Sequence, residues 1–293
     1  MKYLKEKQDV CMRLLSGSAV LDTSQGLIEV AQTGNGPPVL ISHGGGGGYD
    51  MGIWLAELIG QGFQFVAPSR FGYLRSPLPD VPTPERQADA FASLLDALKI
   101  ESAAIIGLSS GGPAALQFAY HYPQRCAGLV MLSAICRSLP PLPMVLRMIF
   151  PFILKSDYIP WFIHAINPDF VYRSNGVNRE LLFQVRKDPD KNRLLANLFQ
   201  TTFPASLRRE GMINDQQQCA VLPEGFLEKI GVPTLVIHAV DDPIVPYKHG
   251  EFSAENIPGA IFLKIKEGGH FCTVTHREDI VPVIRDFLDR FGS

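Results

Sequence analysis

The chain has 293 residues, enough for one large α/β domain or two small ones, and enough to bury a sizeable core. Hydrophobic residues make up 46% of it and charged residues 19%, a composition typical of a globular protein rather than a disordered one. The formal net charge is −2 at pH 7. That charge, and the lack of a basic stripe with interleaved aromatic residues, argue against a nucleic-acid partner.

The sequence also argues against a membrane span and against a disulfide scaffold. The first ten residues are charged and lack the apolar stretch of a signal peptide. The most apolar segment, 140–154, is too short to cross a bilayer, and prolines and an arginine interrupt it. The five scattered cysteines form neither a C-x-x-C pair nor a disulfide framework, so we expect structural roles for them and a cytoplasmic location.

Strand-like and helix-like segments alternate along the chain. Residues 19–21 and 27–30 are expected to form an opening hairpin. Further apolar, strand-like runs follow at 38–42, 63–67, 102–106, 128–132, 234–238 and 261–265. Helical patterns are found at 86–98, 113–120, 179–199 and 279–291. Continuous apolar runs separated by helices predict a mostly parallel sheet covered on both faces.

Between about 137 and 227 the pattern changes, because this segment has no strand candidates. It is rich in prolines and aromatic residues at first, and its apolar residues then follow a helical spacing from 179 to 199. We therefore predict a core domain formed by 1–136 and 228–293, with 137–227 as a helical insertion. The insertion could be a peripheral layer of helices or a cap over a site. Its many aromatic residues favour a cap. The candidate substrate-binding residues in it are Phe150, Tyr158, Trp161 and Phe162.

The most informative motif is Gly107-Leu108-Ser109-Ser110-Gly111-Gly112, which lies between a predicted strand and a predicted helix. Ser109 has glycine two positions before it and two after it, as in the tight turn that presents a nucleophilic serine at a helix N-terminus. Ser110 has Leu108 two positions before it and does not fit this pattern. A glycine-rich turn without a function is the alternative.

A serine hydroxyl needs a base, and that base is usually a histidine. His270 follows the last predicted strand after two glycines, at the sheet edge where open α/β sheets place their sites. His276 is the second choice. The other histidines fit structural positions better, and His238 in particular falls within a strand.

The histidine in turn needs a carboxylate that fixes its tautomer. Asp241 and Asp242 follow the penultimate predicted strand, between Ser109 and His270 in chain order. Adjacent side chains point apart, so only one of the two should reach the histidine. The alternative is an ordinary Asp-Pro turn.

Backbone N–H donors for a developing oxyanion could come from the glycine run 44–48, which follows a predicted strand. The N–H of Ser110 would supply a second donor. A phosphate-binding loop is excluded, because no G-K-[ST] follows and Tyr49 stands where a G-x-G-x-x-G frame needs glycine. A flexible spacer is the remaining alternative.

Taken together and in this order, these motifs resemble those of the α/β-hydrolases over nearly the whole chain. The resemblance implies a mostly parallel eight-stranded sheet with helices on both faces and a helical cap. By the family's D-x-x-V-P pattern it makes Asp242 the acid, and by the His-Gly loop pattern it makes Gly45 an oxyanion donor, with Gly44 as the alternative. No cofactor is implied, and no spacing suggests a metal site.

The chain departs from several branches of this family. Many capped members have an aspartate where this chain has Ser69. The carbon–carbon bond hydrolases usually have Gly-Pro-Gly in the oxyanion loop and tryptophan after the histidine, whereas Phe271 follows His270 here. A serine nucleophile argues against dehalogenases and epoxide hydrolases, and the H-G-G-P-G of proline iminopeptidases is absent.

The leading hypothesis is a serine hydrolase that cleaves small, fairly hydrophobic carboxylic esters through an acyl-enzyme on Ser109. The same triad could act on a carbon–carbon bond, a lactone or an amide, or transfer the acyl group to another acceptor. A non-catalytic protein that binds a small ligand is a third hypothesis. The expected partner is a small-molecule substrate, with no nucleic acid and no membrane span.

Overall fold

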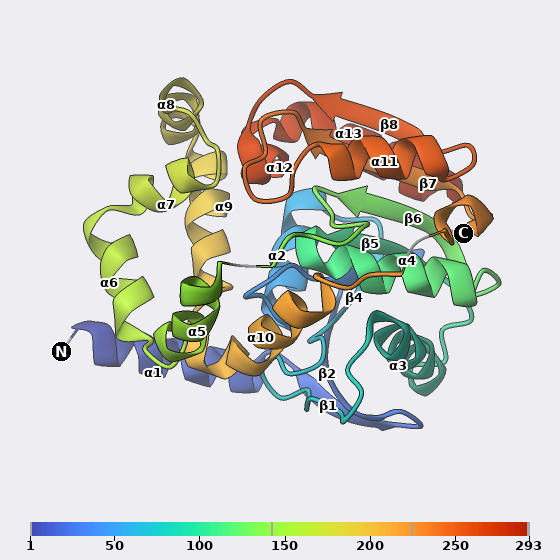
Figure 1. The fold of residues 1–293 in the computed structure, drawn as a ribbon, viewed down its shortest axis with the longest axis horizontal. Coiled ribbons are helices and arrows are strands. Elements are labelled where there is room, and N and C mark those ends of the chain that lie inside the picture. Colours follow the sequence, from blue (N-terminus) through green and yellow to red (C-terminus); the bar gives the residue numbers. More distant parts are fainter. Residues whose placement is uncertain (1, 142, 224, 292–293) are drawn as a thin grey trace.

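A computed structural model describes residues 2–141, 143–223 and 225–291, and its centre is one eight-stranded sheet (Figure 1). The strand order is β1-β2-β4-β3-β5-β6-β7-β8, with antiparallel pairing of β1 to β2 and of β2 to β4 and parallel pairing elsewhere. The predicted fold class is therefore confirmed. The strands are β1 (Ala19–Thr23), β2 (Gly26–Thr33), β3 (Pro38–Ser42), β4 (Gln64–Pro68), β5 (Ala103–Leu108), β6 (Cys126–Leu132), β7 (Thr234–Ala239) and β8 (Ile261–Ile265).

The central strands are apolar on both sides because helices cover both faces of the sheet. Val39 and Ile41 of β3 belong to the core on one face, and Leu40 between them belongs to the core on the other. The first face is covered by α2 (Tyr49–Ile59) and α13 (Arg277–Phe291). The second is covered by α3 (Pro84–Ala97), α4 (Gly112–His121) and α11 (Lys248–Asn256).

Local sequence explains where several helices begin. The Thr83 side chain accepts a hydrogen bond from the backbone N–H of Arg86, and Pro84 occupies the first turn of α3, where its missing N–H costs nothing. The predicted single helix over 179–199 is two helices, α8 (Arg179–Lys187) and α9 (Pro189–Gln200). They separate at Asp188, whose carboxylate caps α9.

The described residues between β6 and β7 form helices and short turns and no strand. They are α5 (Met144–Ile153), α6 (Tyr158–Ile166), α7 (Pro168–Ser174), α8, α9, the 3-10 turn η2 (Ala205–Arg208), α10 (Arg209–Gln218) and the 3-10 turn η3 (Leu227–Lys229). Leu142 and Glu224, which fall in the predicted insertion, lie outside the described residues. In Figure 1 the helices α5 to α9 lie to one side of the sheet.

An N-terminal helix that the sequence analysis did not predict, α1 (Lys2–Ser16), packs against this group. The ring of Tyr3 lies 5.2 Å from the ring of Tyr158 and 5.2 Å from that of Trp161. Lys7 also forms a 2.7 Å ion pair with the buried Asp157. None of the helices in the described part of the chain is long and apolar enough to cross a membrane.

The parallel register brings four loops to one edge of the sheet. The chain leaves β3 into the glycine run, β5 into Ser109, β7 into Asp242 and β8 into His270. Because parallel strands end on the same side, segments far apart in sequence converge there.

Candidate active site

Ser109 occupies a strained turn between β5 and α4. Its φ is +52°, in the left-handed region that non-glycine residues rarely adopt and that costs about 1–3 kcal/mol. The turn is closely packed, because a Cβ on Gly111 would lie 2.0 Å from the Ser42 carbonyl oxygen and one on Gly107 would lie 2.8 Å from the Ala115 Cβ. Steric crowding thus accounts for glycine on both sides of Ser109.

The three residues expected to form a triad are in hydrogen-bond contact. His270 Nε2 lies 2.9 Å from Ser109 Oγ, and His270 Nδ1 lies 2.8 Å from Asp242 Oδ2. A carboxylate can only accept, so Nδ1 carries the proton and Nε2 accepts from the serine hydroxyl. This is the tautomer in which the histidine can take up the serine proton.

Asp242, not Asp241, contacts the histidine. Its Oδ1 accepts the backbone N–H groups of Ile244 and Val245, at 2.8 and 3.0 Å. Burial alone would raise the pKa of the Asp242 carboxyl, but hydrogen bonds from His238 and His270 hold this pKa well below its usual range. The carboxylate is therefore charged whenever His270 is required to act as a base.

His238 is buried in β7, as the sequence predicted, but it has a further contact. Its Nε2 lies 3.5 Å from Asp242 Oδ2 and donates to the Val245 carbonyl at 2.8 Å. The contact with Asp242 could not be predicted from the position of His238 inside a strand. It forms because the chain turns after β7 and brings Asp242, four residues later, back beside the ring.

The glycine loop is fixed by the buried ring of His43. Nδ1 donates to the Gly44 carbonyl at 2.8 Å, and Nε2 accepts the backbone N–H of Arg70 at 2.9 Å, so the ring is neutral. Burial, and secondarily the Arg70 cation, lower the pKa of His43 well below its ordinary value. A Cβ on Gly44 would lie 3.2 Å from the Ser109 Cβ, and one on Gly45 would lie 3.3 Å from Ser110 Oγ, so the loop lies directly against the nucleophile turn.

A cavity of about 870 Å³ opens onto Ser109 and His270. Aliphatic and aromatic side chains dominate its wall, and they come from both the sheet edge and the 137–227 segment. From that segment the wall includes Phe150, Val171, Tyr172, Leu195, Leu198, Phe199 and Met212. A volume and lining of this kind suit a small, largely apolar ligand.

The aromatic residues proposed from the sequence as substrate contacts lie in two places. Phe150 lines the cavity. Tyr158, Trp161 and Phe162 are not among the described residues of its wall. Instead, Tyr158 stacks on Phe162 at 5.6 Å, and both Tyr158 and Trp161 pack on Tyr3 of α1. The rings of Tyr158 and Trp161 thus pack against the N-terminal helix α1, which the sequence analysis did not predict.

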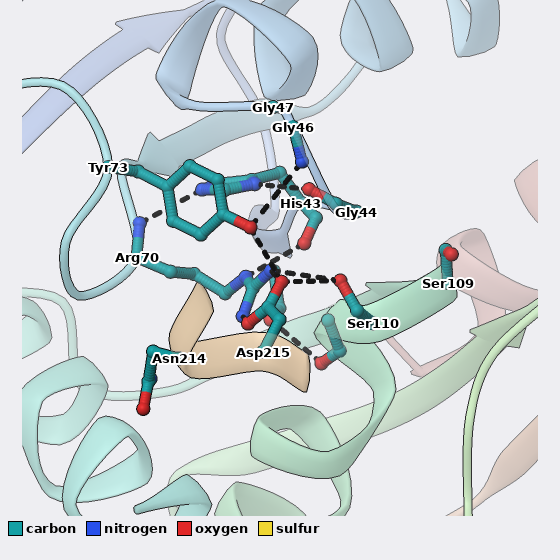
Figure 2. Close-up of polar contacts among 12 residues, drawn as sticks. His43, Gly44, Gly46, Gly47, Arg70, Tyr73, Ser109, Ser110, Asn214 and Asp215 are labelled. Atoms are coloured by element: carbon teal, nitrogen blue, oxygen red, sulfur yellow. Dashed lines mark hydrogen bonds and ion pairs between the residues drawn. The ribbon is translucent and has the colours of Figure 1, made fainter. Parts of the chain in front are cut away.

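The sequence analysis missed a buried polar cluster beside the glycine loop. Figure 2 shows Arg70, Tyr73 and Ser110 directed at the carboxylate of Asp215, which comes from α10. In the sequence around Arg70, only Ser69 stood out, because many capped relatives have an aspartate there. The Ser69 hydroxyl donates to the Glu29 carboxylate at 2.8 Å. Asp215 lies in a polar helix and had no sequence signal of a site.

Four of the five cysteines are buried, which agrees with the structural role expected for them. Burial raises the pKa of the Cys126 and Cys219 thiols to about 12 and that of the Cys136 and Cys272 thiols to about 11. Thiols of this kind are protonated at neutral pH and are poor nucleophiles.

Comparisons with known proteins agree with this geometry. A 252-residue match to an uncharacterized hydrolase, YcgS, of Bacillus subtilis is 28% identical and covers 84% of this chain and 88% of that protein. The 2-hydroxy-6-oxo-6-phenylhexa-2,4-dienoate hydrolase of Comamonas testosteroni is 27% identical, with 91% and 93% covered.

Solved structures show the same similarity. An alpha/beta hydrolase fold protein from Nakamurella multipartita superposes with a TM-score of 0.82 at 27% identity, covering 94% of this chain and 99% of that one. A thermophilic esterase from Thermogutta terrifontis gives 0.70 at 25% identity, with the same coverage. The family model described as alpha/beta hydrolase fold matches residues 37–276. The chain therefore belongs to the alpha/beta hydrolase fold family, and it is a hydrolase of that fold.

Proposed function

We propose that the protein is a serine hydrolase that cleaves small, hydrophobic carboxylic esters. The observation that carries the proposal is the hydrogen-bonded chain from Ser109 Oγ through His270 to Asp242, at the wall of a largely apolar cavity. The similarity to a solved esterase supports the choice of an ester.

In the proposed reaction, Ser109 Oγ attacks the acyl carbon while its proton passes to His270 Nε2. The carbonyl oxygen becomes an oxyanion that the backbone N–H groups of Gly45 and Ser110 would hold, with Gly44 as the alternative first donor. His270 then gives the proton to the leaving alcohol. A water molecule, deprotonated by the same histidine, hydrolyses the acyl-enzyme and releases the acid.

We further propose that residues 137–227 act as a cap that shapes the substrate pocket. Support comes from the cavity wall, to which α5, α7, α9 and α10 all contribute side chains. The apolar lining favours an acyl or alcohol group of hydrophobic character. The cytoplasmic location expected from the sequence stays a prediction.

A fluorophosphonate probe tests the nucleophile. We expect intact-protein mass spectrometry to show one adduct on the wild type and none on Ser109→Ala, since removal of a triad residue costs several orders of magnitude in rate. An unmodified wild-type protein, or an adduct that persists in Ser109→Ala, would contradict the proposal.

The bond type needs a separate experiment, because the relative from Comamonas testosteroni is named as a hydrolase of a dienoate. A panel of p-nitrophenyl esters of increasing acyl length should show turnover, with a preference for the longer, apolar chains that the cavity can hold. Labelling of Ser109 without turnover of any ester, together with hydrolysis of a 2-hydroxy-6-oxo-dienoate, would instead assign carbon–carbon bond cleavage.

A further inference from the structure

A buried ion pair joins the segment between β6 and β7 to the loop after β4, immediately beside the nucleophile turn. Arg70 Nη1 and Nη2 donate to the two carboxylate oxygens of Asp215, at 2.7 and 2.6 Å. Their side chains are only 7% and 12% exposed. The reaction proposed above does not use this pair, although Asp215 lines the cavity.

The first residue that the pair holds is Ser110, the neighbour of the nucleophile. Ser110 Oγ accepts from Arg70 Nη2 at 3.1 Å and donates to Asp215 Oδ2 at 2.8 Å, so both members of the pair restrain it (Figure 2). The backbone N–H of this same residue is one of the two proposed oxyanion donors.

The second element that the pair holds is the glycine loop. Arg70 Nε donates to the His43 carbonyl at 2.8 Å, next to Gly44. The Tyr73 hydroxyl donates to Asp215 Oδ2 at 2.6 Å and accepts the Gly46 N–H at 3.4 Å. Contacts of the pair therefore reach the chain on both sides of Gly45, which carries the other proposed donor.

We propose that Arg70 and Asp215 are positioning residues for the oxyanion hole, and that the helical insertion is needed to complete that hole. The proposal rests on the proposed serine hydrolase function. Neither residue performs a bond-making step. Together they hold the Ser110 and Gly45 backbone donors at the separation that a tetrahedral oxyanion requires.

A second arginine from the same segment supports this inference. Arg208 of η2 is fully buried, donates from Nη1 to the Gly47 carbonyl at 2.6 Å and pairs with Asp50 at 2.8 Å. The C-terminal end of the glycine loop, at Gly47, is therefore also held by a residue of the insertion. Residues 205–215 therefore reach the five-glycine loop at two places, directly through Arg208 and, from Asp215, through the Tyr73 hydroxyl. The backbone of a glycine run is intrinsically flexible, so these contacts add to the restraint from His43.

Charge explains why the aspartate needs the arginine. Asp215 lies within hydrogen-bond distance of Ser110, and an unpaired carboxylate there would repel the oxyanion. Burial disfavours the Arg70 cation, but the adjacent carboxylate more than offsets this and raises the pKa of Arg70, so the guanidinium stays charged. Loss of Arg70 alone should therefore be more harmful than loss of both residues, since it leaves a buried charge unpaired.

The test compares Arg70→Met, Asp215→Leu and the double variant with the wild type, using the best p-nitrophenyl ester and a boronic acid that mimics the tetrahedral intermediate. We expect kcat to fall about 10- to 100-fold in each single variant, less than the 10²–10³-fold of losing a donor outright. KM should change little, and boronate affinity should fall in parallel with kcat. The double variant should regain part of the activity that Arg70→Met loses.

Arg75→Met is the matched control. It removes an arginine that pairs at 2.7 Å with the buried Glu29 and does not line the cavity, so it should lower the melting temperature without lowering kcat. Unchanged kcat and boronate affinity in folded Arg70→Met and Asp215→Leu would overturn the inference and leave the pair a purely structural role.

If those variants do not fold, Ser110→Ala decides the question. It removes only the hydroxyl through which the pair holds Ser110, so kcat should fall about tenfold at constant KM if the inference is right, and stay constant if it is wrong. Failure of the proposed function looks different. In that case the wild type itself neither reacts with the fluorophosphonate nor turns over any ester.

Discussion

At the scale of single residues, two adjacent aspartates have different partners. Asp242 contacts His270, whereas the oxygens of Asp241 accept the backbone N–H groups of Gly268 and Gly269 at 3.2 and 2.9 Å. One aspartate orients the imidazole and the other fixes the loop that carries it. From the residues alone, either aspartate could be the one that contacts the histidine, because adjacent side chains point apart in both cases. Only the family's D-x-x-V-P pattern favoured Asp242.

Asparagine substitutions separate the two roles. Asp242→Asn should lower kcat about 10³–10⁴-fold, because an amide cannot hold the required histidine tautomer. Asp241→Asn keeps one acceptor oxygen for the loop that carries His270, so its kcat should fall less than about tenfold. Steady-state kinetics on one ester measure both. Equal losses in the two variants would contradict this division.

At the scale of elements, the nucleophile turn depends on how closely α4 approaches β3. Gly111 lies against the end of β3, and the Ser42 hydroxyl donates to the Gly111 carbonyl at 2.8 Å. This contact brings the glycine loop, which continues from β3, beside Ser110. The strand–turn–helix pattern was legible in the sequence because each part is local, and so was the Ser…Asp…His order.

A single added methyl group tests this packing. In Gly111→Ala the new Cβ would lie 2.0 Å from a backbone oxygen that cannot move alone, so we expect a loss of stability of about 3 kcal/mol or more. Gly231→Ala is the control, since a Cβ there meets nothing within 4 Å, and its stability should stay within about 0.5 kcal/mol of the wild type. Thermal unfolding followed by circular dichroism measures both, and equal melting temperatures would refute the argument.

Contacts between distant elements could not be predicted in the same way. Arg70 and Asp215 are 145 residues apart, and nothing in the polar sequence around Asp215 distinguishes it from a solvated helix. Tyr158 and Trp161 are a second example. Their aromatic character favoured a role in substrate binding, but it could not show that their rings would pack on Tyr3 of α1. Pairings of this kind are decided by the tertiary arrangement, not by local periodicity.

At the scale of the whole molecule, buried histidines couple folding to pH. Burial lowers the pKa of His249 to about 4, and it also holds the pKa of His43 well below its ordinary value. Both rings are therefore neutral in the folded protein at pH values where an unfolded chain, with a histidine pKa near 6.5, takes up protons. Their contribution to stability is fully present above about pH 6.5 and is lost as the pH falls below it.

Urea unfolding between pH 7.5 and 4.5 should show this loss. Each of the two histidines should add up to about 1.4 kcal/mol per pH unit to the slope of the unfolding free energy. His249→Asn keeps an acceptor for the Cys136 N–H, at present 3.3 Å from the ring, and should flatten the slope by one histidine. A slope equal to that of the wild type would mean that His249 takes up its proton in the folded state.

The two arginine–aspartate contacts of residues 205–215 also bear on how relatives of this protein can be recombined. A hybrid that exchanged the whole segment 137–227 with a relative would replace Arg208 and Asp215 together with the pocket wall. The recipient's glycine loop would then meet side chains that did not evolve with it. A crossover near residue 204 avoids this, because it exchanges only α5 to α9. Arg208 and Asp215 then stay with the glycine loop and the loop after β4 that they contact. Such a hybrid would exchange the part of the cavity wall that comes from α5, α7 and α9, and it would keep Arg208, Met212 and Asp215 with the glycine loop.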